Sequence, residues 1–248
     1  CATPLRVGLQ QLNATAQDCP SGMLTVAAGS YQMGSENGNP DEKPVHIVRL
    51  RAYCVDATEV TVGAYRSCVG AGGCRSPQST VDPECNWGQS ARENHPINCV
   101  NWNEAKSYCE WNGARLPTEE EWEYAARGID GRTYPWGEDA PGPGLLNGCG
   151  AECKAWAARN RMNWNALYDA SDGWETTSPV GSFPTGNSPF GLKDMAGNVW
   201  EWTESGYSAD YGTSRTTEHR VYRGGSSLNG EARFFRSANR GGNTPSNR

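Results

Sequence analysis

Ten cysteines are the residues of this chain best suited to chemistry, because thiolates bind soft metals and thiols form disulfides. They stand at positions 1, 19, 54, 68, 74, 85, 99, 109, 149 and 153. No Cys-x-x-Cys pair occurs and the three histidines are scattered, so the spacing does not favour zinc. The even number predicts disulfides and an oxidising compartment. Cys68–Cys74 and Cys149–Cys153 are short-range candidates, and the other pairings stay open.

Three consecutive carboxylates, Glu119 to Glu121, are the next candidates, since paired acids can act as general acid and base. Thr118 is followed three residues later by Glu121, which matches a helix capping box. Acidic residues also suit the positive end of a helix dipole. The local pattern therefore favours a structural role over a catalytic pair.

Ser226, in a Gly-Gly-Ser motif, could be imagined as a nucleophile, but no motif histidine accompanies it. The chain shows no Ser-His-Asp arrangement, P-loop or dinucleotide fingerprint. We therefore expect the Ser226 hydroxyl to make a hydrogen bond within a turn.

Composition limits the class of protein. The 248 residues suit one large domain, or one domain with an arm. Lys and Arg total 22 against 28 Asp and Glu, and the net charge of −6 argues against nucleic-acid binding. Thirty Gly and 15 Pro predict many turns, while ten Trp indicate an aromatic core rather than disorder. No apolar run approaches the roughly 18 residues of a transmembrane helix.

Few regular elements are available to position these residues. Residues 1–22 are polar and aperiodic, so we expect an arm or linker before a domain at 23–248. The hydrophobic patterns predict a hairpin at 23–26 and 30–33, strands at 45–55, 199–203 and 220–223, and helices at 61–69, 104–111 and 118–127. Residues 129–190 are rich in turn formers, so disulfides, metal ions or buried tryptophans must order them.

A series of ordered motifs resembles the formylglycine-generating enzymes, or sulfatase-modifying factors. The motifs lie at 33–34, 41–46 (DEKPVH), 56–61 (DATEVT), 95–97, 115–128 (RLPTEEEWEYAARG), 134–137 (YPWG), 179–184, 191–192, 197–202 (GNVWEW) and 223–226 (RGGS). The resemblance covers residue 23 to the end. It implies an α+β, irregular, loop-rich, C-type-lectin-like fold with few short strands and about three helices. The family pattern continues to a closing strand, which we expect to be missing here.

The resemblance also implies structural calcium in the loops. Calcium prefers oxygen ligands, including backbone carbonyls, so Gly, Val and Trp can contribute. The first site would use Asn147, Gly148, Asp172 and Trp174, and the second Asp194, Gly197, Val199 and Glu201. Alternatively, both aspartates cap turns and Glu201 is a buried polar anchor.

The sequence departs from the enzymes where their chemistry takes place. The family uses two cysteines that bind Cu(I) shortly after the Arg-Gly-Gly-Ser motif, whereas the last cysteine here is Cys153. Asn229 stands where the first would be expected, and an amide is a poor Cu(I) ligand. We expect no copper and no oxidase mechanism.

In the enzymes a cysteine near the end pairs with the position of Cys109, which must here be free or paired elsewhere. His46 and His95 lie in shared segments, so we expect structural roles.

The first functional hypothesis is a noncatalytic, secreted or surface-anchored domain that binds a protein or glycan on the surface formed by 227–247. Arg and aromatic residues often anchor interfaces, and Asn and Ser adapt their hydrogen bonds. The candidate ligand-binding residues are Trp200, Ser226, Ser227, Asn229, Arg233, Phe234, Phe235, Arg236, Asn239, Arg240 and Asn243. The alternative is that the two phenylalanines belong to the core and the arginines are structural. Variable proteins of diversity-generating retroelements, which share this fold, are a special case.

Two other functions remain open. One is a formylglycine-generating oxidase that acts on a protein cysteine, and the other is a structural subunit of a cell-envelope assembly. In each case we expect an extracytoplasmic, bacterial location, no nucleic-acid partner and no transmembrane segment. Cys1 is a candidate lipid anchor, because mature bacterial lipoproteins begin with cysteine.

Overall fold

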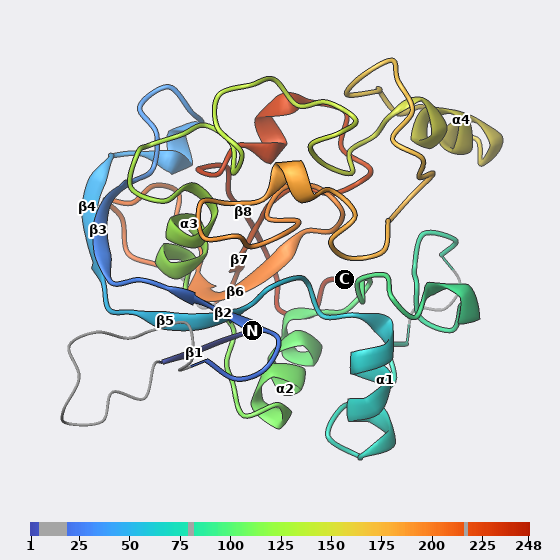
Figure 1. Ribbon diagram of the computed structural model, residues 1–248, viewed down its shortest axis with the longest axis horizontal. Coiled ribbons are helices and arrows are strands. Elements are labelled where there is room, and N and C mark those ends of the chain that lie inside the picture. Colours follow the sequence, from blue (N-terminus) through green and yellow to red (C-terminus); the bar gives the residue numbers. More distant parts are fainter. Residues whose placement is uncertain (5–18, 79–81, 216–217) are drawn as a thin grey trace.

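Small antiparallel sheets connected by long loops form the framework (Figure 1). The computed structural model describes residues 1–4, 19–78, 82–215 and 218–248. One sheet has the order β1-β5-β2, a second pairs β3 with β4, and a third has the order β6-β7-β8. The strands are β1 (Ala2–Pro4), β2 (Met23–Val26), β3 (Gly29–Met33), β4 (His46–Leu50), β5 (Tyr53–Asp56), β6 (Glu201–Gly206), β7 (Arg220–Arg223) and β8 (Gly241–Asn243).

The three expected helices are present, and a fourth was missed. They are α1 (Val62–Gly70), α2 (Trp102–Trp111), α3 (Glu119–Arg127) and the additional α4 (Ala151–Arg159). Thr118 and Glu121 form the expected capping box, so the structural role of Glu121 is confirmed. Helix α4 lies in the stretch expected to be irregular and buries Cys153, Trp156 and Ala157. The loop-rich α+β fold class is therefore confirmed. No helix among the described residues is both long and apolar enough to cross a membrane.

Strand pairing differs from the expected hairpin. Strands β2 and β3 have the expected positions but do not pair with each other, because β2 pairs with β5 and β3 with β4. The expected strand at 45–55 is accordingly divided into β4 and β5. Local alternation found these strands, but partners distant in the sequence decide the pairing.

The N-terminal residues are part of the domain rather than an arm. Strand β1 pairs with β5, and disulfides join Cys1 to Cys109 and Cys19 to Cys54. Of the arm expected at 1–22, residues 1–4 and Cys19 thus contact the domain, while 5–18 lie outside the described residues. The sulfur of Cys1, the candidate lipid anchor, is bonded to Cys109 in this structure.

All ten cysteines form disulfides. Besides Cys1–Cys109 and Cys19–Cys54, the structure contains Cys85–Cys99 and both expected short-range pairs, Cys68–Cys74 and Cys149–Cys153. Cys109 is thus paired with Cys1. No thiol remains for metal binding or redox catalysis.

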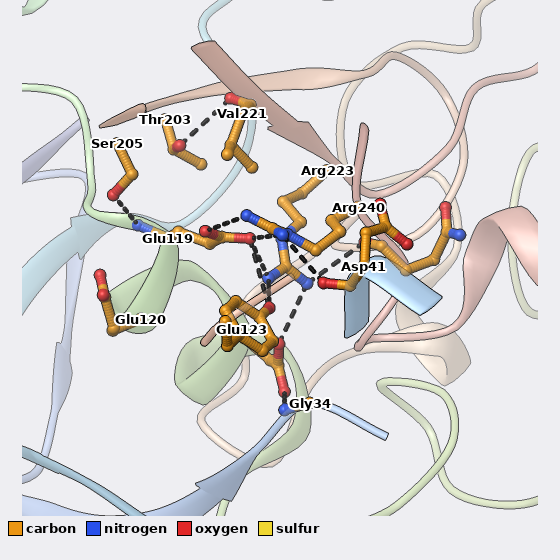
Figure 2. Close-up of polar contacts among 12 residues, drawn as sticks. Gly34, Asp41, Glu119, Glu120, Glu123, Thr203, Ser205, Val221, Arg223 and Arg240 are labelled. Atoms are coloured by element: carbon orange, nitrogen blue, oxygen red, sulfur yellow. Dashed lines mark hydrogen bonds and ion pairs between the residues drawn. The ribbon is translucent and has the colours of Figure 1, made fainter. Parts of the chain in front are cut away.

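Helix α3 packs between β3 of the second sheet and β6 of the third, and it carries a buried ion-pair network (Figure 2). Arg223 Nη2 donates to Glu119 Oε1 at 2.6 Å, and Arg240 Nε donates to the same oxygen at 2.6 Å. Arg223 also lies 3.1 Å from Glu123 Oε2. Although burial favours the neutral acid, Arg223 and Arg240 lower the pKa of Glu119 below its ordinary value. The network therefore joins α3 to the C-terminal segment.

Replacing Glu119 with Gln should lower the free energy of unfolding by about 3–5 kcal/mol, because two buried guanidinium groups lose their anionic partner. Chemical denaturation with a two-state fit measures the change. Glu120→Gln is the matched control, since Glu120 pairs with Arg215 at a partly exposed position and should cost less than about 1 kcal/mol. Equal losses in the two variants would contradict the assigned role of the network.

The disulfides should differ in their contribution to stability. Cys1–Cys109 spans 108 residues of sequence separation, and Cys149–Cys153 spans 4. By loop entropy, replacing both cysteines of the first pair with Ala should cost about 4–5 kcal/mol, against about 2 kcal/mol for the second. Urea denaturation of the two double variants tests this. A larger loss from the short-range pair would refute the entropic ranking.

Candidate functional site

A cavity of about 370 Å³ lies where the third sheet meets the loops around residues 97–100 and 176–177. Four of the predicted ligand-binding residues line it together: Trp200, Ser226, Ser227 and Asn243. The cavity is also lined by residues that the sequence did not single out, among them Asn198, Trp202 and Tyr222. The GNVWEW motif could have identified Asn198 and Trp202, and the position of Tyr222 in β7 could have identified the tyrosine.

Aromatic rings fix one wall of the cavity. The Trp200 ring packs edge-to-face against Tyr222, with ring centroids 4.9 Å apart, and against Phe234 at 6.1 Å. Trp202 also packs edge-to-face against Tyr222, with ring centroids 5.8 Å apart, and its indole nitrogen donates to the Val100 carbonyl at 3.1 Å. Interlocked rings held in this way offer a rigid apolar surface to a ligand.

A tight turn after the Arg-Gly-Gly-Ser motif forms the polar edge of the cavity. Asn229 Oδ1 accepts from the backbone nitrogen of Ser226 at 2.8 Å and from its hydroxyl at 3.1 Å. The backbone nitrogen of Ser227 donates to the Asn198 carbonyl at 2.9 Å. The turn hydrogen bond expected for Ser226 is thus present. Asn229 holds the turn through its side-chain oxygen.

Part of the expected ligand surface lies inside the fold, whereas Asn243 lines the cavity. Phe235 is in a hydrophobic cluster with Tyr134 and Leu146, and Phe234 packs against that cluster. Asn239 is buried. Arg233 alone of the expected arginines is exposed, and it pairs with Glu231.

Arg236 and Arg240 both pair with buried carboxylates of the fold. Arg236 Nη1 donates at 2.7 Å to Glu42, a fully buried carboxylate. Arg240 is buried and bonded to Glu119. The two guanidinium groups thus compensate the charge of buried carboxylates.

The histidines also have structural roles. Nδ1 of His95 lies 3.0 Å from the Thr177 hydroxyl, and burial lowers its pKa to about 4. The His46 ring packs against Tyr211, and its Nδ1 lies 3.0 Å from the Pro44 carbonyl. Neither contacts Ser226, so the described residues give that hydroxyl no histidine base.

The residues of the first expected calcium site lie on both sides of α4 in the chain, with Asn147 and Gly148 before it and Asp172 and Trp174 after it. Asn147 Oδ1 is buried without a hydrogen-bond partner. Asp172 accepts from the Tyr168 hydroxyl at 2.7 Å and from the backbone nitrogen of Trp174 at 2.9 Å. Burial raises the pKa of Asp172, against the opposing effect of Tyr168. The Asx turn at Asp172 matches the alternative role, whereas the orphaned amide oxygen fits a cation ligand.

The second expected site contains a carboxylate that the sequence reading missed. Glu201 accepts from the Trp122 indole nitrogen at 2.8 Å, and burial raises its pKa to about 7. Asp194 accepts from the backbone nitrogen of Gly181. Burial, and then the charges of Asp194 and Glu201, raise the pKa of Glu59 well above its ordinary value. Neither of its buried carboxylate oxygens has a hydrogen-bond partner. Its place in the DATEVT motif was the signal that could have identified it.

These loops suit an oxygen-seeking cation better than a thiophilic one. No group of three or more His, Cys, Asp or Glu side chains in the described part of the chain is arranged to hold a metal by itself. A cation at either place would therefore need backbone carbonyls or water in addition to the carboxylates, as calcium sites commonly use. The orphaned buried oxygens of Asn147 and Glu59 show that the residues present fit such an ion.

Comparisons with known proteins agree with this architecture. The Sulfatase-modifying factor enzyme 1-like domain family matches residues 9–248. A formylglycine-generating enzyme of Streptomyces coelicolor is 33% identical, covering 90% of this chain and 85% of the relative. The inactive C-alpha-formylglycine-generating enzyme 2 of Bos taurus is also 33% identical, covering 90% and 83%. Among solved structures, PvdO from Pseudomonas aeruginosa superposes with a TM-score of 0.72 at 28% identity, covering 91% of this chain and 89% of PvdO.

The family match spans nearly the whole chain, and the relatives are covered over most of their length. Some of these relatives are named as enzymes and others as inactive. The ordered motifs, the loop-rich fold and these matches together show that the chain belongs to the sulfatase-modifying factor family.

Proposed function

We propose that this chain is a noncatalytic, extracytoplasmic domain that binds a protein or glycan ligand in the cavity beside residues 226–228. One observation carries the proposal. All ten cysteines are used in disulfides, and Asn229 is bonded within its own turn, while the cavity beside it is retained. The site thus keeps a binding surface without the thiolates that Cu(I) chemistry needs.

The character of the cavity supports binding. Aromatic rings of Trp200 and Tyr222 supply apolar area, and the hydroxyl and amide groups of Ser226, Ser227 and Asn243 supply a few directional contacts. Ligand sites usually combine these features. The inactive Bos taurus relative shows that the family includes members named as lacking activity. Five disulfides suit an oxidising compartment.

The proposal predicts that Trp200→Ala weakens ligand binding about 30-fold or more, since truncating a central aromatic anchor costs about 2 kcal/mol or more. Ligands selected from a peptide-display library and a glycan array would be titrated against both proteins. Trp111→Ala is the matched control, because Trp111 is 41% exposed on α2 and does not line the cavity. Its affinity should equal that of the wild type.

Enzymatic activity is the competing function, since the Streptomyces coelicolor relative is named as a formylglycine-generating enzyme. The protein would be incubated with Cu(I) and a cysteine-containing sulfatase peptide, and the product would be read by mass spectrometry. We expect no formylglycine. Conversion of the peptide would overturn the noncatalytic proposal, and equal ligand affinity in Trp200→Ala would overturn the proposed site.

We also propose that calcium stabilises the loops around Asp172 and Asp194. The orphaned oxygens of Asn147 and Glu59 support this, because a bound cation would satisfy them. Adding calcium to chelator-treated protein should raise the melting temperature, by mass action on the folded state. Differential scanning calorimetry tests this, with magnesium as the comparison ion. An unchanged melting temperature, together with no calcium by elemental analysis, would contradict the proposal.

A further inference from the structure

We propose that the outer edge of strand β4 binds an extended, acidic peptide segment of a partner protein, which adds a strand to the β3–β4 sheet. This surface shares no lining residue with the ligand cavity, so the inference is independent of the function proposed above. Three features of the edge define the partner: an open backbone, unpaired positive charge and an exposed apolar hollow.

The backbone of β4 is open on one side. The strand belongs to a two-stranded sheet, pairs with β3 alone and lies at the margin of the molecule (Figure 1). Among the described residues, no backbone hydrogen bond other than those to β3 involves positions 46–50. A row of outward-facing N–H and C=O groups is a template for a further strand. An extended peptide is the ligand that matches it.

The edge also carries positive charge that the fold leaves unpaired. Arg49 is exposed on β4, and Arg51 is exposed two residues further along the chain. Neither guanidinium has a carboxylate partner in the part of the chain that the structure describes. The segment 46–51 itself contains no acidic residue. Pairing of this edge with a second copy of itself would bring together positive charges only, so the geometry favours a different, acidic segment.

An apolar hollow lies on the solvent face of the same sheet. It has a volume of about 370 Å³ and is lined by Ile47 of β4 and by Ile129, which follows α3. The two side chains are 64% and 72% exposed, and among the described residues only one other large apolar side chain is exposed. Gln32, the cross-strand neighbour of Ile47, also lines the hollow. Exposed apolar surface gathered in one place is typical of an interaction site.

The spacing of these groups predicts a sequence pattern for the partner. Side chains two residues apart in a strand point to the same face, and Ile47 and Arg49 both face solvent. Opposed side chains of neighbouring strands lie about 5 Å apart. An added strand would therefore place an apolar residue beside Ile47 and an acidic residue, two positions away, beside Arg49. The partner segment is thus extended, with an apolar residue and one or two Asp or Glu at alternate positions.

Two fluorescein-labelled peptides, Thr-Leu-Thr-Glu-Thr-Glu-Thr and its reverse sequence, test both strand directions by fluorescence anisotropy with the intact protein. We expect at least one to bind saturably. The double variant Arg49→Glu/Arg51→Glu should raise its Kd about tenfold or more, because attraction becomes repulsion. The matched control is Arg75→Glu, which makes the same change of charge at an exposed arginine outside the hollow. It should bind the peptide as the wild type does.

Backbone pairing is tested separately with N-methylated peptides. One version is methylated at the Leu and Glu amides and the other at the Thr amides, so only one of them can still donate towards β4. We expect one version to lose binding and the other to keep it. Equal binding of the two versions, or an unchanged Kd in the double variant, would overturn the inference. Absence of saturable binding by either peptide would also overturn it, and the arginines would then only protect the edge from aggregation.

Discussion

The buried ion-pair network around Glu119 is the interaction on which the rest of the structure depends. It links the first turn of α3 to Arg223 at the end of β7 and to Arg240 just before β8. These charges lie inside the protein, so each guanidinium must keep its carboxylate. By holding β7 and the C-terminal segment against α3, the network fixes the start of the turn at Ser226 and thereby one edge of the ligand cavity.

The segment from Asp194 to Trp202 connects the expected calcium ligands to the aromatic wall of the ligand cavity. Its first residues include the expected calcium ligands, and its last residues form the aromatic wall of the cavity. Asp194 and Asn198 adopt positive φ values of 55° and 57°, a conformation in which non-glycine residues are uncommon. Such a backbone needs support from its surroundings. Disulfides, buried charge and the proposed cation would supply that support in a protein with little regular structure.

Sequence reasoning succeeded where the signal was local. The capping box at Thr118 identified α3, and hydrophobic alternation identified β7 at its observed bounds. It failed where distant residues decide the outcome. Pairing of β2 with β5 rather than with β3 depends on contacts that no local pattern encodes, and a short alanine-rich helix such as α4 has little amphipathic signal.

In the candidate site, too, the sequence predicted what a local motif marks and missed what depends on distant residues. Trp200 and Ser226 were identified because they lie in recognisable motifs, and they line the cavity together with Ser227. The buried carboxylate partners of Arg236 and Arg240 were not predicted, because a sequence cannot show which arginine faces such a group. Glu59 was missed for the corresponding reason: its isolation from donors is visible only in three dimensions.

The most direct test of the central claim, that no thiol is left for copper chemistry, is alkylation of the denatured, unreduced protein followed by intact mass measurement. The account predicts an unmodified chain, and two or more alkylated cysteines would contradict it.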